Sequence, residues 1–291
     1  MMITILTPSY NRAHLLNRVY KSLIEQTYHN FEWIIVNDGS TDNTDEIVLS
    51  FIANNRININ YIKQENGGKH RAVNRGVKEA KGELFFIADS DDMLPNNALE
   101  KVVKIYEEIK DDNSFAGVCG LDGTFDGRMI GSGLPEEKID DNAISIRYKL
   151  GVTGDMKEVF RTEVLKEFPF PEIEGECFCP EALVWNRIAN KYRLRYVNQI
   201  IYLAEYQNNG ITAGIVRARM NSPIASMMTY AEMTEYKEMP IRTKMKSAIN
   251  YWRFYFCHRS SNNYPTLSWE WKWTKPIGWA MHLRDLKVNR K

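Results

Sequence analysis

The first 110 residues alternate between two hydrophobic periodicities, and this alternation constrains the fold more than any other feature of the sequence. Short apolar runs, typical of buried strands, are each followed by apolar residues at helical spacing. This alternation predicts right-handed βαβ units and a mainly parallel sheet with helices on both faces. The expected strands are Ile3–Leu6, Phe31–Val36, Ile57–Ile62 and Leu84–Ala88. The expected helices include Leu15 to Ile24, Ile47 to Ile52, Ala72 to Ala80 and Leu99 to Ile109.

The pattern weakens beyond Phe115. A glycine-rich stretch from Leu121 to Gly133 is typical of a hairpin with loops, while Glu181–Lys191 and Ser222–Tyr236 are expected to be helical. The chain has 291 residues, 44% of them apolar and 26% charged. This composition is that of a globular protein with a large core, and it excludes disordered, collagen-like and disulfide-scaffold proteins.

Polar segments follow the first three expected strands. Ligands of open parallel sheets bind beyond the carboxyl ends of the strands, so these segments are candidate binding residues. Thr7–Arg12 offers hydroxyls, an aromatic ring and a guanidinium, which suit a base, a sugar and a phosphate; the alternative is a capped helix start. Asp38 can accept hydrogen bonds from a base or a ribose, although the Asn37–Asp42 segment also suits a helix cap. The glycines of Glu65–Lys69 permit close backbone approach, with Lys69 facing a phosphate, or form a plain turn.

The most specific feature is Asp89-Ser90-Asp91-Asp92, directly after the fourth expected strand. Three carboxylates within four residues repel one another unless a cation or strong donors compensate. Asp89 and Asp91 point to the same side of an extended segment, and oxygen ligands suit Mg²⁺ or Mn²⁺. The alternative is an acidic helix N-terminus, but one acid suffices for capping. We therefore expect a divalent metal site here.

The net charge of +1 conceals an uneven distribution of charge. Residues 241–291 carry eleven basic and two acidic groups, a net charge of +9, and five of the seven tryptophans. The first 240 residues carry 27 basic and 35 acidic groups, a net charge of −8. We expect neither a signal peptide nor a membrane span. The four cysteines suit a reducing cytoplasm, and the Cys177-Phe178-Cys179 spacing is not that of common zinc sites.

These polar segments, in this order, resemble the family-2 glycosyltransferases of the GT-A fold. The segments that carry the resemblance are Thr7–Arg12, Val36–Asp42, Asn66–Gly68, Asn74–Gly76 and Asp89–Asp92. The resemblance implies a GT-A-like α/β fold, with a mainly parallel central sheet flanked by helices and a helical C-terminal extension. The expected domains are a glycosyltransferase domain over 1–221, with a nucleotide-binding half at 1–115 and an acceptor half at 116–221, and a basic, aromatic extension at 222–291.

The resemblance also assigns expected roles to residues. Pro8 and Tyr10 are expected near the base, and Asp38 near the uracil or ribose. Asp91 is the expected principal metal ligand, with Asp89 on the ribose or the metal. The full set of expected nucleotide-binding residues is Thr7, Pro8, Tyr10, Arg12, Asp38, Asn66, Gly68, Lys69, Asn74, Asp89 and Ser90.

The catalytic base of the family is usually the second residue of a Glu-Asp pair. Alignment on Trp185 puts Glu181 at that place, although this chain has no such pair. Glu181 can take a proton from an acceptor hydroxyl within hydrogen-bond reach; its alternative is an ordinary first-turn helix acid. Glu176 and Asp155 are lesser candidates. No histidine completes the metal site in Tyr206–Thr212, so the third metal ligand stays open, and Tyr206, Asn208 or water is expected to meet the diphosphate there.

The resemblance predicts sugar transfer, with inversion, from a nucleotide sugar, expected to be a UDP-sugar, to a hydroxyl of a polysaccharide or lipid-linked glycan. The alternatives are a non-catalytic sugar-nucleotide-binding subunit and a nucleotidyltransferase. No nucleic-acid partner is expected.

The basic tail at 241–291 predicts a contact with an anionic membrane. Trp269, Trp271 and Trp273 would share one face if this segment were extended. We expect a cytoplasmic protein, peripheral on the inner face of the membrane; the alternative is a tail packed on the acidic body.

Overall fold

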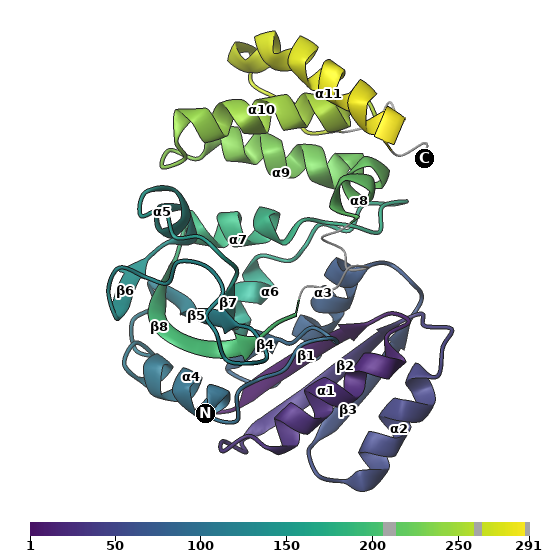
Figure 1. Cartoon of the computed structure of the whole chain (residues 1–291), viewed down its shortest axis with the longest axis vertical. Coiled ribbons are helices and arrows are strands. Elements are labelled where there is room, and N and C mark those ends of the chain that lie inside the picture. The colour runs from purple at the N-terminus through teal and green to yellow at the C-terminus, as the bar shows by residue number, and fades with distance from the viewer. Residues whose placement is uncertain (206–213, 259–263, 289–291) are drawn as a thin grey trace. The chain divides into compact units, whose positions relative to one another are not determined.

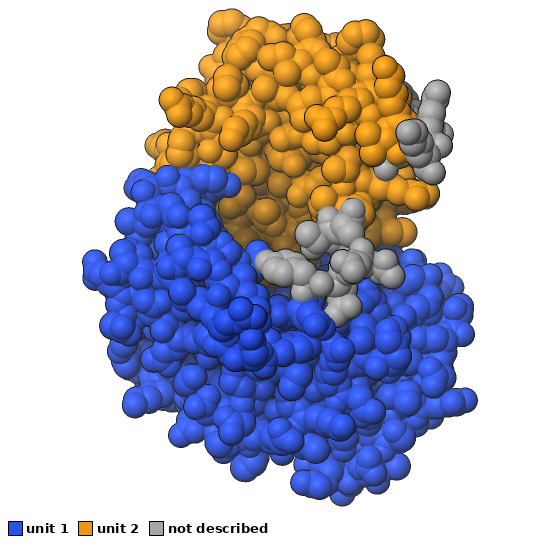
Figure 2. Space-filling view, in the orientation of Figure 1, with its two compact units in different colours: residues 1–169, 191–205 blue, residues 170–190, 206–291 orange. Residues whose placement is uncertain are grey.

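The chain divides into two compact units. A computed structural model describes residues 1–205, 214–258 and 264–288 (Figure 1). Unit 1 comprises Met1–Pro169 and Lys191–Glu205, and unit 2 comprises Phe170–Asn190 and Tyr206–Lys291 (Figure 2). The units therefore interleave along the chain, whereas the boundary expected at residue 221 follows chain order. That boundary stays a prediction.

Unit 1 is built on an eight-stranded sheet, counted over its described residues, in the order β3-β2-β1-β4-β7-β5-β8-β6. The first four strands are parallel, as the alternating periodicity predicts. β7 is antiparallel to both of its neighbours, and β5 and β8 are parallel. The strands are β1 (Ile3–Ser9), β2 (Phe31–Asp38), β3 (Ile59–Gln64), β4 (Leu84–Ile87), β5 (Phe115–Gly123), β6 (Lys138–Asp141), β7 (Met156–Arg161) and β8 (Arg193–Leu203).

Helices cover both faces of this sheet, which confirms the predicted fold class. Residues of α1, α2 and α4 form one core with Ile3, Trp33 and Phe86. Tyr20 and Phe51 stack within it at 4.1 Å between ring centroids. α3 contacts β1 and β2 and lies against Leu6 of the opposite face. The helices of unit 1 are α1 (Ala13–Ile24), α2 (Thr44–Asn54), α3 (Lys69–Glu79), α4 (Ala98–Glu107), α5 (Ala143–Tyr148) and α6 (Thr162–Glu167).

Two segments differ in the structure from what the sequence predicts. The third strand begins at Ile59 rather than Ile57, because its pairing with β2 starts at the Trp33–Ile59 pair. In place of a regular hairpin over Leu121–Gly133, β5 continues to Gly123 and a loop follows, with one isolated bridge between Gly123 and Met129. The glycines of this stretch supply the positive φ that the loop requires.

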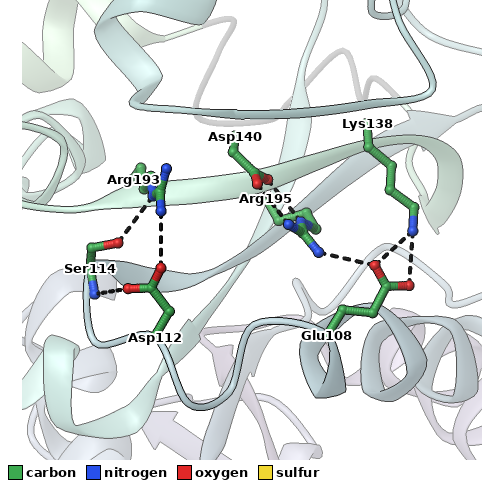
Figure 3. Close-up of polar contacts among 7 residues, drawn as sticks. All are labelled: Glu108, Asp112, Ser114, Lys138, Asp140, Arg193 and Arg195. Carbon is green, nitrogen blue, oxygen red and sulfur yellow. Dashed lines mark hydrogen bonds and ion pairs between the residues drawn. The ribbon is translucent and has the colours of Figure 1, made fainter.

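Ion pairs connect β8 to β6 and to the end of α4 (Figure 3). Arg195 on β8 makes a bidentate contact with Asp140 of β6, at 2.8 and 2.6 Å, and also binds Glu108 at 3.0 Å. Lys138 binds the same Glu108 carboxylate at 2.7 Å. Arg193 binds Asp112 at 3.0 Å. Because the Arg195 side chain is only 17% exposed, its planar fork holds β6 to this edge of the sheet better than a flexible surface pair would.

Unit 2 is helical over its described residues. Met227 and Ala231 of α9 pack against Tyr251, Trp252 and Phe254 of α10. The predicted helices at 181–191 and 222–236 are confirmed, each ending one or two residues early. The elements are α7 (Glu181–Ala189), α8 (Ile215–Asn221), α9 (Pro223–Glu235), α10 (Ile241–Tyr255), the 3₁₀ helix η1 (Trp269–Thr274) and α11 (Lys275–Val288).

The expected helical character of the C-terminal extension is confirmed, and three of its tryptophans do not share one face. Trp269, Trp271 and Trp273 lie in η1, not in an extended segment. Trp271 is buried at 7% exposure, while Trp269 and Trp273 are 79% and 57% exposed. A 3₁₀ helix has three residues per turn, so side chains two apart do not share a face. Across the described residues, no helix combines the length and apolarity needed to span a membrane.

Candidate functional site

The carboxyl ends of β1, β2, β3 and β4 bring the predicted segments to one edge of the sheet. Ser9 pairs with Asn37, and Asp38 with Gln64, at the last positions of their strands. The loops after β1 and β2 are tied together, since the Asn11 amide donates to Ser40 Oγ at 3.0 Å and the Thr41 amide to Asn11 Oδ1 at 2.8 Å. The sequence therefore located this edge correctly.

Asp42 caps two helices in this edge. Its Oδ2 accepts from the Ala13 amide, the first of α1, at 3.0 Å, and its Oδ1 accepts from the Thr44 amide, the first of α2, at 3.1 Å. A carboxylate at a helix N-terminus satisfies amides that have no partner within the helix and interacts favourably with the helix dipole. The capping role considered for this segment therefore belongs to Asp42, and the nucleotide-binding role expected of Asp38 stays a prediction.

The buried carboxylate of Asp38 holds the glycine loop that follows β3. Its Oδ1 accepts from Gln64 Nε2 at 2.7 Å and the Gly67 amide at 2.9 Å. Its Oδ2 accepts from the Gly68 amide at 2.7 Å and Asn66 Nδ2 at 3.3 Å. Gly68 has a φ of 95°, which favours glycine. Asp38 thus positions the loop, and any contact with a nucleotide must share an already occupied carboxylate.

The first two carboxylates of the acidic motif are each paired with a cation from another part of the chain. Asp89 Oδ1 lies 2.6 Å from Lys69 Nζ, and Asp89 Oδ2 lies 4.0 Å from Lys157 Nζ. Asp91 Oδ2 lies 3.3 Å from Arg12 Nη1. Burial acts to raise the pKa of Asp89, but the two lysines lower it to about 2. Asp89 is therefore charged at neutral pH, as a metal ligand or a cation partner must be.

Tyr202 of β8 holds the acidic motif in place, a role that no sequence pattern indicates. Its hydroxyl accepts from the Asp89 amide at 2.7 Å and donates to Asp92 Oδ2 at 2.8 Å. Lys157 Nζ lies 3.8 Å from the centroid of the Tyr202 ring, in a cation–π contact. Burial and the neighbouring Asp89 raise the pKa of Asp92 to about 7. Asp92 therefore differs from the other two aspartates because it is buried beside Asp89, and its hydrogen bond from Tyr202 only partly offsets the rise of its pKa.

The residues of this motif fit a divalent cation. Asp89 and Asp91 remain 31% and 21% exposed, so their oxygens are reachable from solvent. Magnesium sites often use only one or two carboxylates, with phosphates and water as the other ligands. Among the described residues, no cluster of three or more His, Cys, Asp or Glu side chains forms a complete metal cage. A substrate phosphate would therefore have to complete the coordination.

The other expected nucleotide-binding residues differ in what their side chains already contact. Thr7 is buried, and its hydroxyl accepts from Trp33 Nε1 at 2.9 Å. Tyr10 is 49% exposed beyond the end of β1, whereas Pro8 is half-buried within that strand. Asn74 lies on α3, half-buried, and Ser90 is buried in the acidic motif. The exposed Tyr10 ring is the one that offers a stacking face to solvent.

The acceptor-side candidates lie on different elements. Glu181 is the exposed first residue of α7, in unit 2. Glu176 is buried and accepts from the Ile224 and Ala225 amides, at 2.7 and 2.9 Å, so it caps α9. Asp155 is exposed just before β7 in unit 1. The Tyr206–Thr212 segment lies outside the described residues. Glu181 stays the predicted base, and Glu176 is occupied by its capping role.

The comparisons with known proteins agree with this site. Residues 4–167 match the sequence profile described as Glycosyl transferase family 2. The glycosyltransferase GlyG of Streptococcus pneumoniae is 29% identical over 222 residues, which cover 72% of each chain. Several other curated glycosyltransferases match over only 15% to 36% of their own length.

Solved structures with low sequence identity share the fold. S. aureus TarS, solved in complex with UDP-GlcNAc, has a TM-score of 0.64 at 20% identity, over 89% of this chain and 72% of that one. The mannosyltransferase PcManGT from Pyrobaculum calidifontis, in complex with GDP-Man and Mn²⁺, has a TM-score of 0.59 at 18% identity, over 96% and 73%. The family profile spans every segment of the sheet edge described above, and the solved structures share the fold. The chain therefore belongs to the family-2 glycosyltransferases and has their GT-A fold.

Proposed function

We propose that this glycosyltransferase moves a sugar from a UDP-sugar to a hydroxyl of a polysaccharide or lipid-linked glycan, with inversion and with a divalent metal. The observation that carries the proposal is the pairing of Asp89 with Lys69 and of Asp91 with Arg12 at the carboxyl edge of the sheet. Carboxylates and cations interleaved in this way can bind a diphosphate and its metal together. The UDP-GlcNAc complex of TarS supports a uridine donor.

Asp91 and Asp89 would hold the metal. When bound, Mg²⁺ or Mn²⁺ supplies Lewis-acid neutralisation of the charge that builds on the leaving diphosphate. Arg12 and Lys69 already lie against these carboxylates and would contact the phosphates. The glycine loop, held by Asp38 through the Gly67 and Gly68 amides, would lie beside the nucleotide.

Glu181 would take the proton of the acceptor hydroxyl, so that a single displacement inverts the anomeric centre. A positioned general base typically contributes about a hundredfold to ten-thousandfold in rate. The carboxylate of Glu181 is exposed at the first residue of α7, whereas that of Glu176 is buried and caps α9.

The test is turnover of a panel of UDP- and GDP-sugars by the wild type, Asp91→Ala and Glu181→Gln, with product detection. Loss of the metal ligand should lower turnover at least about a hundredfold, since such ions supply several kcal/mol. Asp126→Asn, which changes an exposed carboxylate paired with Arg128, is the matched control. Full activity of both site variants would refute the proposal. Nucleotide binding without product would instead indicate the non-catalytic binding subunit.

We also place the enzyme in the cytoplasm, on the inner face of the membrane, where lipid-linked acceptors lie. The net charge of +9 over residues 241–291 supports this location.

A further inference from the structure

The helix α11 packs on unit 2 through a face of small and polar residues. Its buried residues are Gly278, His282 and Asp285, at the spacing of one helical face. Asp285 accepts from Arg253 of α10 at 2.5 and 2.8 Å, and His282 Nδ1 lies 3.5 Å from Cys257 Sγ. α11 therefore attaches to the rest of unit 2 through small and polar residues.

The opposite side exposes large apolar side chains. On α11, Ile277, Trp279 and Leu283 are 44%, 52% and 37% exposed. Trp269 and Trp273 of the preceding η1 are more exposed still, at 79% and 57%. Single exposed apolar residues need no explanation, but a concentration of them marks an interaction surface. Five such residues within fifteen positions form this concentration.

Cations accompany these residues, and acids are scarce. Lys272, Arg284 and Lys287 are exposed on the same two elements. Within Trp269–Val288, all of which the structure describes, the acids are Glu270 and Asp285, and the Asp285 charge is neutralised by Arg253. We call the set Trp269, Lys272, Trp273, Ile277, Trp279, Leu283, Arg284 and Lys287 the aromatic-basic surface.

We propose that the aromatic-basic surface docks on an anionic lipid bilayer, with the tryptophans and aliphatic side chains in the headgroup region and the cations on the lipid phosphates. Tryptophan favours the membrane interface, and each Lys or Arg near an anionic leaflet adds to binding. A protein partner would have to match apolar and cationic groups at fixed positions, whereas a fluid leaflet matches any such arrangement. This inference deepens the proposed membrane location by naming the surface within the helical extension that would make the contact.

Point substitutions are the right test, because deleting residues from Ile241 onward would expose the core that α9 shares with α10. The aromatic variant is Trp269→Ser with Trp273→Ser and Trp279→Ser. The charge variant is Lys272→Gln with Arg284→Gln and Lys287→Gln. The matched control is Lys21→Gln with Arg56→Gln and Lys78→Gln, which removes three exposed cations from unit 1.

Cosedimentation is measured without donor or metal, on vesicles of equal parts phosphatidylglycerol and phosphatidylcholine and on vesicles of phosphatidylcholine alone. The wild type and the control should bind the anionic vesicles alike. Losing three cations should weaken that binding about a hundredfold, at about 1 kcal/mol per cation. The aromatic variant should lose binding as well, and wild-type binding should fall with added salt.

Each contrary result has a distinct meaning. If the variants bind like the control, the surface is misassigned although the membrane location stands. If the wild type itself binds neither kind of vesicle, both the surface and the location are wrong. A concentration-dependent dimer that the aromatic variant abolishes, without vesicle binding, would identify a second copy as the occupant and overturn the proposal. Sugar transfer to a soluble acceptor is unaffected by any of these results.

Discussion

Replacing Asp38 by Asn distinguishes two roles of the carboxylate at the end of β2: holding the glycine loop that follows β3, and contacting the nucleotide directly. In the structure, each oxygen of Asp38 accepts two hydrogen bonds, from Gln64 and Gly67 on one side and from Asn66 and Gly68 on the other. An amide has one oxygen and one NH₂ group, so in either orientation two donors of the loop would face another donor.

The expected cost follows from that count. Hydrogen bonds to a charged group contribute about 1.5–3 kcal/mol each, and a buried donor left without an acceptor costs a similar amount. Losing two of the four bonds at a buried site should therefore lower the free energy of unfolding by about 3–5 kcal/mol. That is a large part of the roughly 5–15 kcal/mol that stabilises a typical domain.

Urea unfolding of Asp38→Asn measures this loss, with UDP affinity by calorimetry as the second readout. Asp126→Asn removes the same charge from an exposed site and should change stability by at most about 0.5 kcal/mol. Gln64→Ala removes one donor to the charged Asp38 and should cost about 1.5–3 kcal/mol, which keeps the test usable if Asp38→Asn does not fold.

The reasoning fails if Asp38→Asn unfolds within about 1 kcal/mol of the wild type and yet loses UDP binding. In that case the carboxylate would contact the nucleotide directly, and the loop would be held by other means.

Three further predictions concern other parts of unit 1. Arg195→Ala should lower the free energy of unfolding by about 2 kcal/mol. Lys138→Ala, at the exposed end of the same ion-pair network, should lower it by under about 1 kcal/mol. Equal losses would contradict the role given to the bidentate contact between Arg195 and Asp140. Burial raises the pKa of Glu158 from 4.5 to about 7. Between these two values the folded state keeps a proton that the unfolded chain releases. The free energy of unfolding therefore falls as the pH rises from about 4.5 to about 7. Glu158→Gln should therefore match the wild type in Tm near pH 5 and exceed it above about pH 7, and a Tm difference independent of pH would count against this. Tyr202→Phe keeps the ring that contacts Lys157 but leaves the Asp89 amide without its acceptor. Calorimetric titration should therefore show weaker Mn²⁺-dependent UDP binding. Unchanged Mn²⁺ affinity would mean that the Tyr202 hydroxyl contributes to stability alone.

The sequence predicted the parallel half of the fold well, for a local reason. Each of the first four strands is a short apolar run with its own helix after it, so the periodicity alone identifies the βαβ units. Parallel strands deliver their carboxyl ends to one edge, and for that reason Asp38 and Asp89 could be placed at a common edge before the structure was known.

The rest of the site depends on pairings that no local pattern encodes. β7 inserts between β4 and β5 in antiparallel orientation, and it brings Lys157 beside Asp89. Tyr202 reaches Asp92 across 110 positions of the chain. Alternation over a few residues does not distinguish a strand from a 3₁₀ helix, so a shared face for Trp269, Trp271 and Trp273 could be expected only if that segment were extended.

The interleaving of the two units limits how this enzyme can be recombined with its relatives. The chain leaves unit 1 after Pro169, contributes α7 to unit 2, returns for β8 and leaves again after Glu205. Arg187 of α7 forms a bidentate contact with Glu232 of α9, so both segments belong to one folding unit. A chimera that exchanges only residues beyond Glu205 would join α7 of one parent to α9 of another. Transplanting unit 2 intact therefore requires three junctions, near residues 170, 190 and 205, and the predicted base Glu181 travels with it.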